Sequence, residues 1–139
     1  MHLPSTVFLT AAVTFLAGLF YFFSAFMVGQ LRGRHGIKAP ACEGHPAFDR
    51  AYRVQLNTLE QFGIFLPMLW LAALYPIGWA WLAPLVGLVW VIARLIYRAG
   101  YMADPERRLL GAMMSGACSA ILTILAGAGL VIAALDHTA

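Results

Sequence analysis

The sequence predicts an all-α integral membrane protein in which four helices cross the bilayer as a single domain, residues 1–139. Composition is the first reason: 62% of the residues are hydrophobic and only 11% are charged, whereas a soluble domain has roughly 25% charged residues. The second reason is that four long apolar segments alternate with short stretches rich in glycine, proline and charge. A chain with so little polar surface needs lipid as its solvent over most of its length.

The four predicted spans cover about residues 5–31, 49–75, 79–101 and 106–135. No basic residue precedes the first apolar run, so we expect a retained span and not a signal peptide. The loop after it contains residues that break helices: Gly33, Gly36, Pro40, Gly44 and Pro46. The short Pro-Ile-Gly break at 76–78 makes the second and third helices antiparallel neighbours.

The basic residues predict the orientation of the chain. All nine lie at or near the first and third connections: Arg32, Arg34, Lys38, Arg50, Arg53, Arg94, Arg98, Arg107 and Arg108. By the positive-inside rule, we expect both connections in the cytoplasm and both termini outside. The composition, rich in alanine and arginine, favours a bacterial inner membrane over the endoplasmic reticulum.

Two of the spans are too short without their polar ends. The purely apolar parts are residues 62–75 and 79–93, which at 1.5 Å per residue extend about 21–22 Å against a hydrocarbon core of about 30 Å. Each helix must therefore bring polar residues into the cytoplasmic part of the bilayer or into a protein-lined cavity there. Antiparallel packing sets the two polar groups at one depth.

These polar residues form stripes. On the second segment, Arg53, Asn57 and Glu60 follow i, i+4, i+7 and share one helix face. The third segment carries a matching stripe: Arg94, Tyr97, Arg98 and Tyr101. In one interpretation Glu60 only neutralises an arginine while other arginines reach the headgroups. In the other, which we favour because ionisable residues inside a span are costly, the stripes form a functional site.

The inventory of this site suits an anionic ligand with an amine. The guanidinium group of arginine binds a carboxylate through two parallel hydrogen bonds, and Glu60 can hold an ammonium group. Asn57 and the tyrosines add neutral hydrogen bonds. Glutathione has these groups and a thiol that a nearby cation would activate. We expect no metal, since the histidines lack metal-site spacing and Cys42 and Cys118 are expected to be free thiols. Small residues at four-residue spacing in the last segment are interpreted as packing: Gly111, Ala112, Ser115, Gly116, Ser119 and Ala120.

The stretch Arg53-x-x-x-Asn57-x-x-Glu60 resembles the opening of the second helix in the family of membrane-associated proteins in eicosanoid and glutathione metabolism, MAPEG. A second match runs from Ala93 to Tyr101 and is followed by Arg108. The sequence is most similar to the branch of leukotriene-C4 synthase and microsomal glutathione transferase 2. The resemblance implies a left-handed four-helix bundle that assembles as a homotrimer, with glutathione bound between subunits on the cytoplasmic side.

The resemblance also implies roles for individual residues. Arg108 matches the catalytic arginine that holds the thiol as a thiolate, and Arg94 would support the site or contact the tripeptide. The remaining glutathione-binding positions are Arg32, Arg53, Gln55, Asn57, Glu60, Tyr97 and Tyr101. The implied function is a glutathione transferase acting on lipophilic electrophiles, in detoxification or lipid metabolism, with peroxidase activity left open. The chain is expected to form a homotrimer with two further copies of itself and to contact membrane lipid. No nucleic-acid partner is expected.

Two departures from the branch limit the implied chemistry. Gln61 stands where the branch has tyrosine, and Gly33 stands where it has a second arginine, with Arg34 one place later. General conjugation is therefore a safer expectation than leukotriene synthesis. The alternative is a non-catalytic lipid-binding scaffold resembling the five-lipoxygenase-activating protein. A small transporter or purely structural bundle is less favoured, because the polar residues stop in one half of the bilayer.

Overall fold

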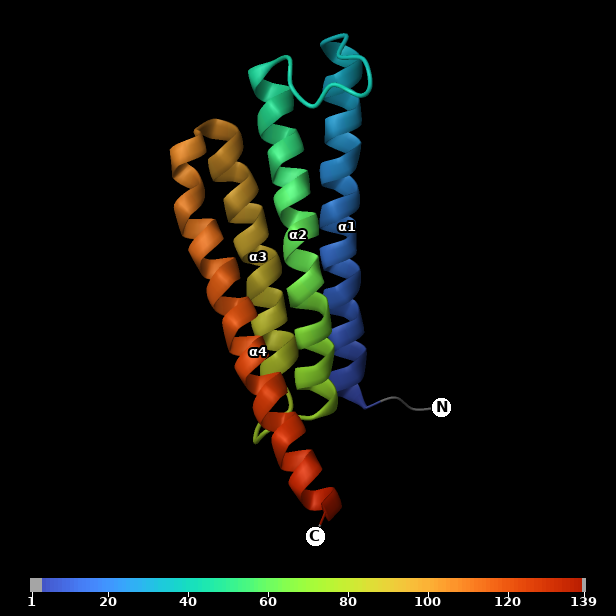
Figure 1. Ribbon diagram of the computed structural model, residues 1–139, viewed down its shortest axis with the longest axis vertical. Coiled ribbons are helices and arrows are strands. Elements are labelled where there is room, and N and C mark those ends of the chain that lie inside the picture. The colour runs from blue at the N-terminus through green and yellow to red at the C-terminus, as the bar shows by residue number, and fades with distance from the viewer. Residues whose placement is uncertain (1–3, 139) are drawn as a thin grey trace.

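The computed structural model describes residues 4–138 and has four long helices side by side (Figure 1). These are α1 (Ser5–Arg34), α2 (Pro46–Leu74), α3 (Leu82–Ala103) and α4 (Leu109–Thr138), with a short 3-10 helix, η1 (Pro105–Arg108), before α4. The inner pair, α2 and α3, lies between α1 and α4 (Figure 1). The part of the chain that is described contains no strand, so the predicted all-α fold is confirmed.

The helix ends correct three details of the sequence prediction. Pro46 was expected to break a helix, but it begins α2, where proline costs nothing because the first N–H groups of a helix have no partner. The His45 side chain caps this end by accepting a hydrogen bond from the Ala47 N–H (3.2 Å). Gly33 lies within α1 and not in the loop, and α3 begins at Leu82, three residues later than expected.

Three of the helical segments are long and apolar enough to cross a membrane: α1, α3, and η1 together with α4. The exception is α2, whose first half carries polar residues: Arg50, Arg53, Gln55, Asn57, Glu60 and Gln61. Its 29 residues still extend about 44 Å at 1.5 Å per residue, enough to cross. The chain is therefore an integral membrane protein whose inner helix α2 is polar over half of its length.

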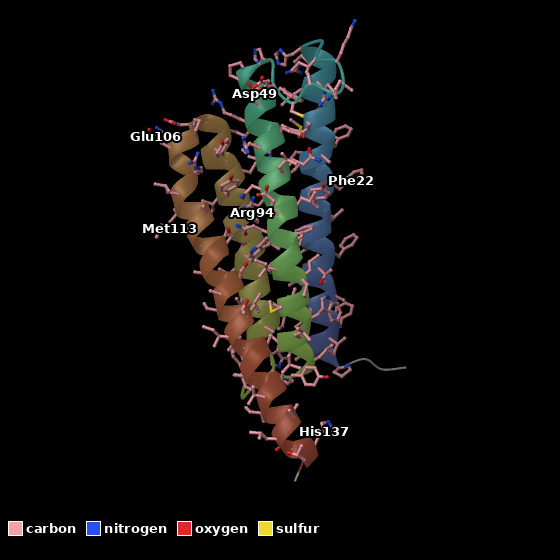
Figure 2. All side chains as sticks on the ribbon, viewed as in Figure 1. Phe22, Asp49, Arg94, Glu106, Met113 and His137 are labelled. Atoms are coloured by element: carbon pink, nitrogen blue, oxygen red, sulfur yellow. The ribbon has the colours of Figure 1, made fainter. Side chains whose placement is uncertain are left out.

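Both ends of the described chain lie at one end of the bundle, and the α1–α2 loop and η1 lie at the other (Figure 1). The two basic connections are thus on the same side, as the sequence predicted. Apolar side chains such as Phe22 and Met113 point away from the bundle, whereas Arg94 points into it (Figure 2). The side of the membrane that the basic end faces stays a prediction.

The main apolar core lies toward the chain termini and draws residues from all four helices. The Phe65 ring of α2 stacks on Trp90 of α3, with ring centroids 3.8 Å apart and planes 7° from parallel. Leu69 and Leu122 are fully buried beside them. A smaller cluster near the α1–α2 loop contains Val28, Leu31, Phe48 and Ala51. Between the two clusters, the buried residues include the polar side chains of Ser24 on α1 and Thr58 on α2.

Candidate functional site

A polar pocket of about 400 Å³ opens at the basic half of the bundle, where α2, α3 and η1 meet. It is lined by Arg53, Asn57, Glu60, Tyr97, Tyr101 and Arg108. All six were singled out in the sequence. The pocket therefore brings together the stripe on α2, both tyrosines of α3 and the arginine that precedes α4.

The α2 stripe faces the pocket because the adjacent face of the helix is packed. Val54 and Thr58 are fully buried, whereas Arg53 and Glu60 are exposed and Asn57 is half-buried. The 3.6-residue period of a helix separates these two sets of side chains. Packing of Val54 and Thr58 consequently fixes the direction in which the polar stripe points.

The aromatic wall is formed by two tyrosines one turn apart on α3. Tyr97 is buried, Tyr101 is half-buried, and their ring centroids are 5.7 Å apart. Gly111 of α4 packs directly on the Tyr97 backbone, and a Cβ at that position would overlap it. The close approach of α4 to α3 therefore depends on glycine at 111.

Arg108 reaches the pocket from a tight corner between α3 and α4. The Asp104 carboxylate caps η1 by accepting a hydrogen bond from the Glu106 N–H (3.0 Å). A Cβ at Gly100 would lie 2.5 Å from the Arg107 carbonyl oxygen, so glycine lets η1 fold back onto α3. The corner sets the Arg108 guanidinium carbon 5.5 Å from the Tyr101 ring centroid.

Arg94 lies behind the pocket wall and does not line it. The side chain is fully buried, and its Nη2 donates a hydrogen bond to Thr58 Oγ1 of α2 (2.8 Å). Its guanidinium carbon is 4.1 Å from the Tyr97 ring centroid. Of the two roles that the resemblance implied for Arg94, this placement favours support of the site.

Arg32 and Gln55 are not brought into the pocket of the single chain. Arg32 Nη1 donates a hydrogen bond to the Ala41 carbonyl (2.9 Å), and its guanidinium carbon is 4.8 Å from the Phe48 ring centroid. These contacts fold the α1–α2 loop against α2. Gln55, two residues after Arg53, lies on another face of α2.

A second cavity, of about 550 Å³, adjoins the pocket on the loop side and shares Arg53 and Tyr101 with it. The sequence did not indicate this cavity, because the α1–α2 loop that forms one wall has no periodic pattern. Arg50 helps to fix it by donating hydrogen bonds to the Met102 and Ala103 carbonyls (2.9 and 3.2 Å). Those carbonyls end α3, where helix carbonyls lack partners of their own.

An apolar groove of about 490 Å³ continues from the pocket between α2 and α4. It shares Asn57 and Glu60 with the pocket, and its remaining lining is Gln61, Ile64, Gly116, Ser119, Ala120 and Thr123. The sequence predicted packing for the small residues of α4. Gly111 and Ser115 are buried as expected, but Gly116 and Ala120 are exposed and line the groove. Their spacing indicated one face of α4 but not what that face contacts.

The pocket carries a positive surplus, since two arginines and one glutamate line it. Within residues 4–138, no group of three or more histidine, cysteine or acidic side chains is arranged to hold a metal ion. Cys42 is exposed and Cys118 is buried, and both are free thiols as expected. The site is thus suited to hydrogen bonding and ion pairing with an organic anion.

Fold and pocket together define a class: helical membrane proteins with a positively biased pocket in one half of the bundle. The family model of the MAPEG family matches residues 10–128, and the chain belongs to this family. The chain is 34% identical to human microsomal glutathione S-transferase 2 over 132 residues, covering 93% of this chain and 86% of the relative. It is 37% identical to bovine leukotriene C4 synthase, with coverage of 88% and 81%. An uncharacterized protein of Synechocystis, sll1147, is 39% identical, with coverage of 82% of each chain.

Proposed function

We propose that the protein is a membrane-bound glutathione transferase that conjugates glutathione to lipophilic electrophiles. The observation that carries this proposal is the pocket, in which six side chains match the charged and polar groups of glutathione. Membership of a family with relatives named microsomal glutathione S-transferase 2 and leukotriene C4 synthase supports it. The pocket volume of about 400 Å³ is within the usual range for small-molecule sites.

One carboxylate, the α-ammonium group and the peptide groups of glutathione have proposed partners in the pocket. Arg53 binds a carboxylate with its two-pronged guanidinium group, and Glu60 binds the α-ammonium group. Asn57 and the two tyrosines donate or accept the neutral hydrogen bonds that fix the peptide groups. These interactions hold the thiol in one orientation, and orientation of reactants is a large part of catalysis in a two-substrate reaction.

Arg108 is the proposed catalytic residue. A free thiol has a pKa of about 8.5, and a neighbouring cation lowers this pKa and so increases the thiolate fraction at neutral pH. The thiolate then attacks the electrophilic carbon, an S–C bond forms, and a leaving group takes the displaced electron pair. Arg108 is exposed at the pocket margin beside Tyr101, where it can reach the thiol.

The second substrate is proposed to lie in the apolar groove between α2 and α4. The groove begins at Asn57 and Glu60, which also line the pocket, and continues past Ile64 and Ala120. A lipophilic molecule arriving from the bilayer would thus reach the thiolate without crossing water. A lipid hydroperoxide in the same groove would instead be reduced to the alcohol and water, while two glutathione molecules are oxidised to the disulfide.

A homotrimer is proposed to complete the site, which we place on the cytoplasmic side of a bacterial inner membrane. Arg32 and Gln55, which the resemblance assigns to glutathione binding, lie outside the pocket of their own chain. In the proposed trimer they face the pocket of a neighbouring subunit. A cross-linking or mass measurement in detergent tests this proposal, and a monomeric active enzyme would contradict it.

The decisive experiment measures glutathione binding and conjugation of a simple aryl halide by the purified protein, next to Arg53→Ala and Arg108→Ala. We expect Arg53→Ala to weaken glutathione binding and Arg108→Ala to reduce turnover while binding is largely kept. Arg34→Ala, at the exposed end of α1, serves as the matched control. Absence of glutathione binding and of turnover in the wild type would rule out the enzyme.

The second candidate is a lipid-binding scaffold, which the apolar groove between α2 and α4 favours. Such a protein would bind a lipophilic ligand in the groove whether or not glutathione is present. The same preparation tests it with a fluorescent fatty-acid probe. Probe binding without any glutathione binding would support the scaffold against the transferase.

A further inference from the structure

Burial of the Arg94 side chain is energetically unfavourable. Its side chain is fully buried near the middle of the bundle (Figure 2). Its Nε and Nη1 atoms have no hydrogen-bond partner among residues 4–138. Burying a charge without full pairing costs more than any other common polar burial. An ionisable residue retained inside a membrane span under such conditions points to a function.

One hydrogen bond and two aromatic rings hold the Arg94 guanidinium group, the more distant ring being Trp90, whose centroid is 5.9 Å from the guanidinium carbon. Nη2 donates to Thr58 Oγ1 at 2.8 Å, and the Thr58 hydroxyl donates in turn to the Val54 carbonyl at 2.8 Å. On its other side, the guanidinium carbon lies 4.1 Å from the centroid of the Tyr97 ring, a close cation–π distance. Arg94 therefore connects the packed face of α2 to two aromatic rings of α3, of which Tyr97 is the nearer.

Tyr97 is the link between this buried contact and the pocket. Its ring is supported by Arg94, its backbone is packed against Gly111, and it lines the pocket beside Tyr101. We propose that Arg94 is a positioning residue, which acts through Tyr97 by holding the phenol hydroxyl in the pocket wall where it meets glutathione. This inference rests on the proposed glutathione transferase function.

If Arg94 positions Tyr97, replacing Arg94 should weaken glutathione binding without lowering the stability of the bundle. Arg94→Met keeps an unbranched side chain of similar length and removes the incompletely paired charge, so the bundle should unfold at the same temperature or a higher one. Loss of the ring support should nevertheless weaken glutathione binding about tenfold, the equivalent of one hydrogen bond. If Arg94 were only structural, the unfolding temperature and the affinity would fall together.

The first experiment measures the dissociation constant for glutathione and the unfolding temperature of the wild type, Arg94→Met and Arg94→Lys in one detergent. Lysine keeps the charge, but its compact ammonium group cannot lie flat on the Tyr97 ring while it donates to Thr58, so we expect binding to stay weak. Full recovery with lysine would overturn positioning, because charge alone would then suffice. Arg98→Met is the matched control, since Arg98 also lies on α3 but packs over Phe23 and does not line the pocket.

A double-mutant cycle with Tyr97→Phe tests the route of action. If Arg94 acts by placing the Tyr97 hydroxyl, Arg94→Met has little further effect once that hydroxyl is gone. Additive effects of the two substitutions would overturn the proposal. A wild type that binds no glutathione would refute the transferase itself, whereas equal binding by wild type and Arg94→Met would refute only the role of Arg94.

Discussion

The two ends of the bundle are built differently. Toward the chain termini, apolar residues from all four helices form one core around the stacked rings of Phe65 and Trp90. Toward the basic connections, the apolar cluster is small, and polar cavities lie beside α2 and α3. The same helices run through both ends, so the difference comes from which residues each helix presents at each depth.

This contrast indicates a division of tasks. A densely packed core holds the helices in fixed relative positions, because close-packed interiors deform little. The basic end can then keep incompletely packed polar surface where a ligand is expected to bind. Substitutions at the core end should therefore change stability, whereas substitutions at the basic end should change glutathione binding.

The largest stability effect is expected in the core. Leu69 of α2 is fully buried, so Leu69→Ala should lower the free energy of unfolding by about 2–5 kcal/mol through lost contacts and a cavity. Glutathione affinity of the protein that remains folded should not change. Leu95→Ala, at an exposed position of α3, is the control and should shift stability by about 0.5 kcal/mol or less. Denaturant titration and binding measurements check both variants.

A matched pair of glycines tests the two ends directly. A Cβ at Gly111 would overlap the Tyr97 backbone, and a Cβ at Gly129 would overlap the Tyr75 carbonyl. Alanine at either position should destabilise the protein by about 1–3 kcal/mol because the helices must separate. Only Gly111→Ala should also weaken glutathione binding. Equal loss of binding in Gly129→Ala would show that the two ends are not independent.

A smaller effect is expected when the shape of one cation is changed. Arg53→Lys keeps the positive charge in the pocket but loses the planar fork that binds a carboxylate at two points. We expect the KM for glutathione to rise about tenfold with a smaller change in kcat, since an interaction of this kind acts mainly on binding. Arg34→Lys is the control. An unchanged KM would remove Arg53 from the proposed carboxylate contact.

The smallest effect concerns the α1–α2 loop at the basic end. The His35 and His45 rings stack with centroids 3.5 Å apart, and partial burial, His45 and Arg34 lower the pKa of His35 below 6.5. The folded loop therefore binds protons less readily than the unfolded chain, so its stability is complete above about pH 6.5 and falls as the pH drops below that value. Limited proteolysis of the loop should become faster on acidification. His35→Phe should remove this pH dependence.

The sequence was sufficient for much of the candidate pocket. The spacing of Arg53, Asn57 and Glu60 places them on one helix face by local geometry alone, and the position of Pro76 and Gly78 makes α2 and α3 antiparallel. It was not sufficient for Arg32, whose guanidinium group folds the loop onto Phe48, nor for the groove beside Gly116. The first outcome depends on how an irregular loop folds, and the second on the packing of α2 against α4, which are distant in the chain.

The sequence by itself determined that the chain lies in a membrane, where its helices are and in which order they follow. Hydrophobicity, helix period and helix breakers determine these features, because they act over a few neighbouring residues. Only the tertiary structure decided which polar residues became buried and which line a cavity. Arg94 and Arg53 look equivalent in the sequence, as arginines at the polar end of a span. In the fold, Arg94 lies behind the Tyr97 ring and Arg53 lines the pocket, because helix rotation and helix separation depend on contacts among all four helices.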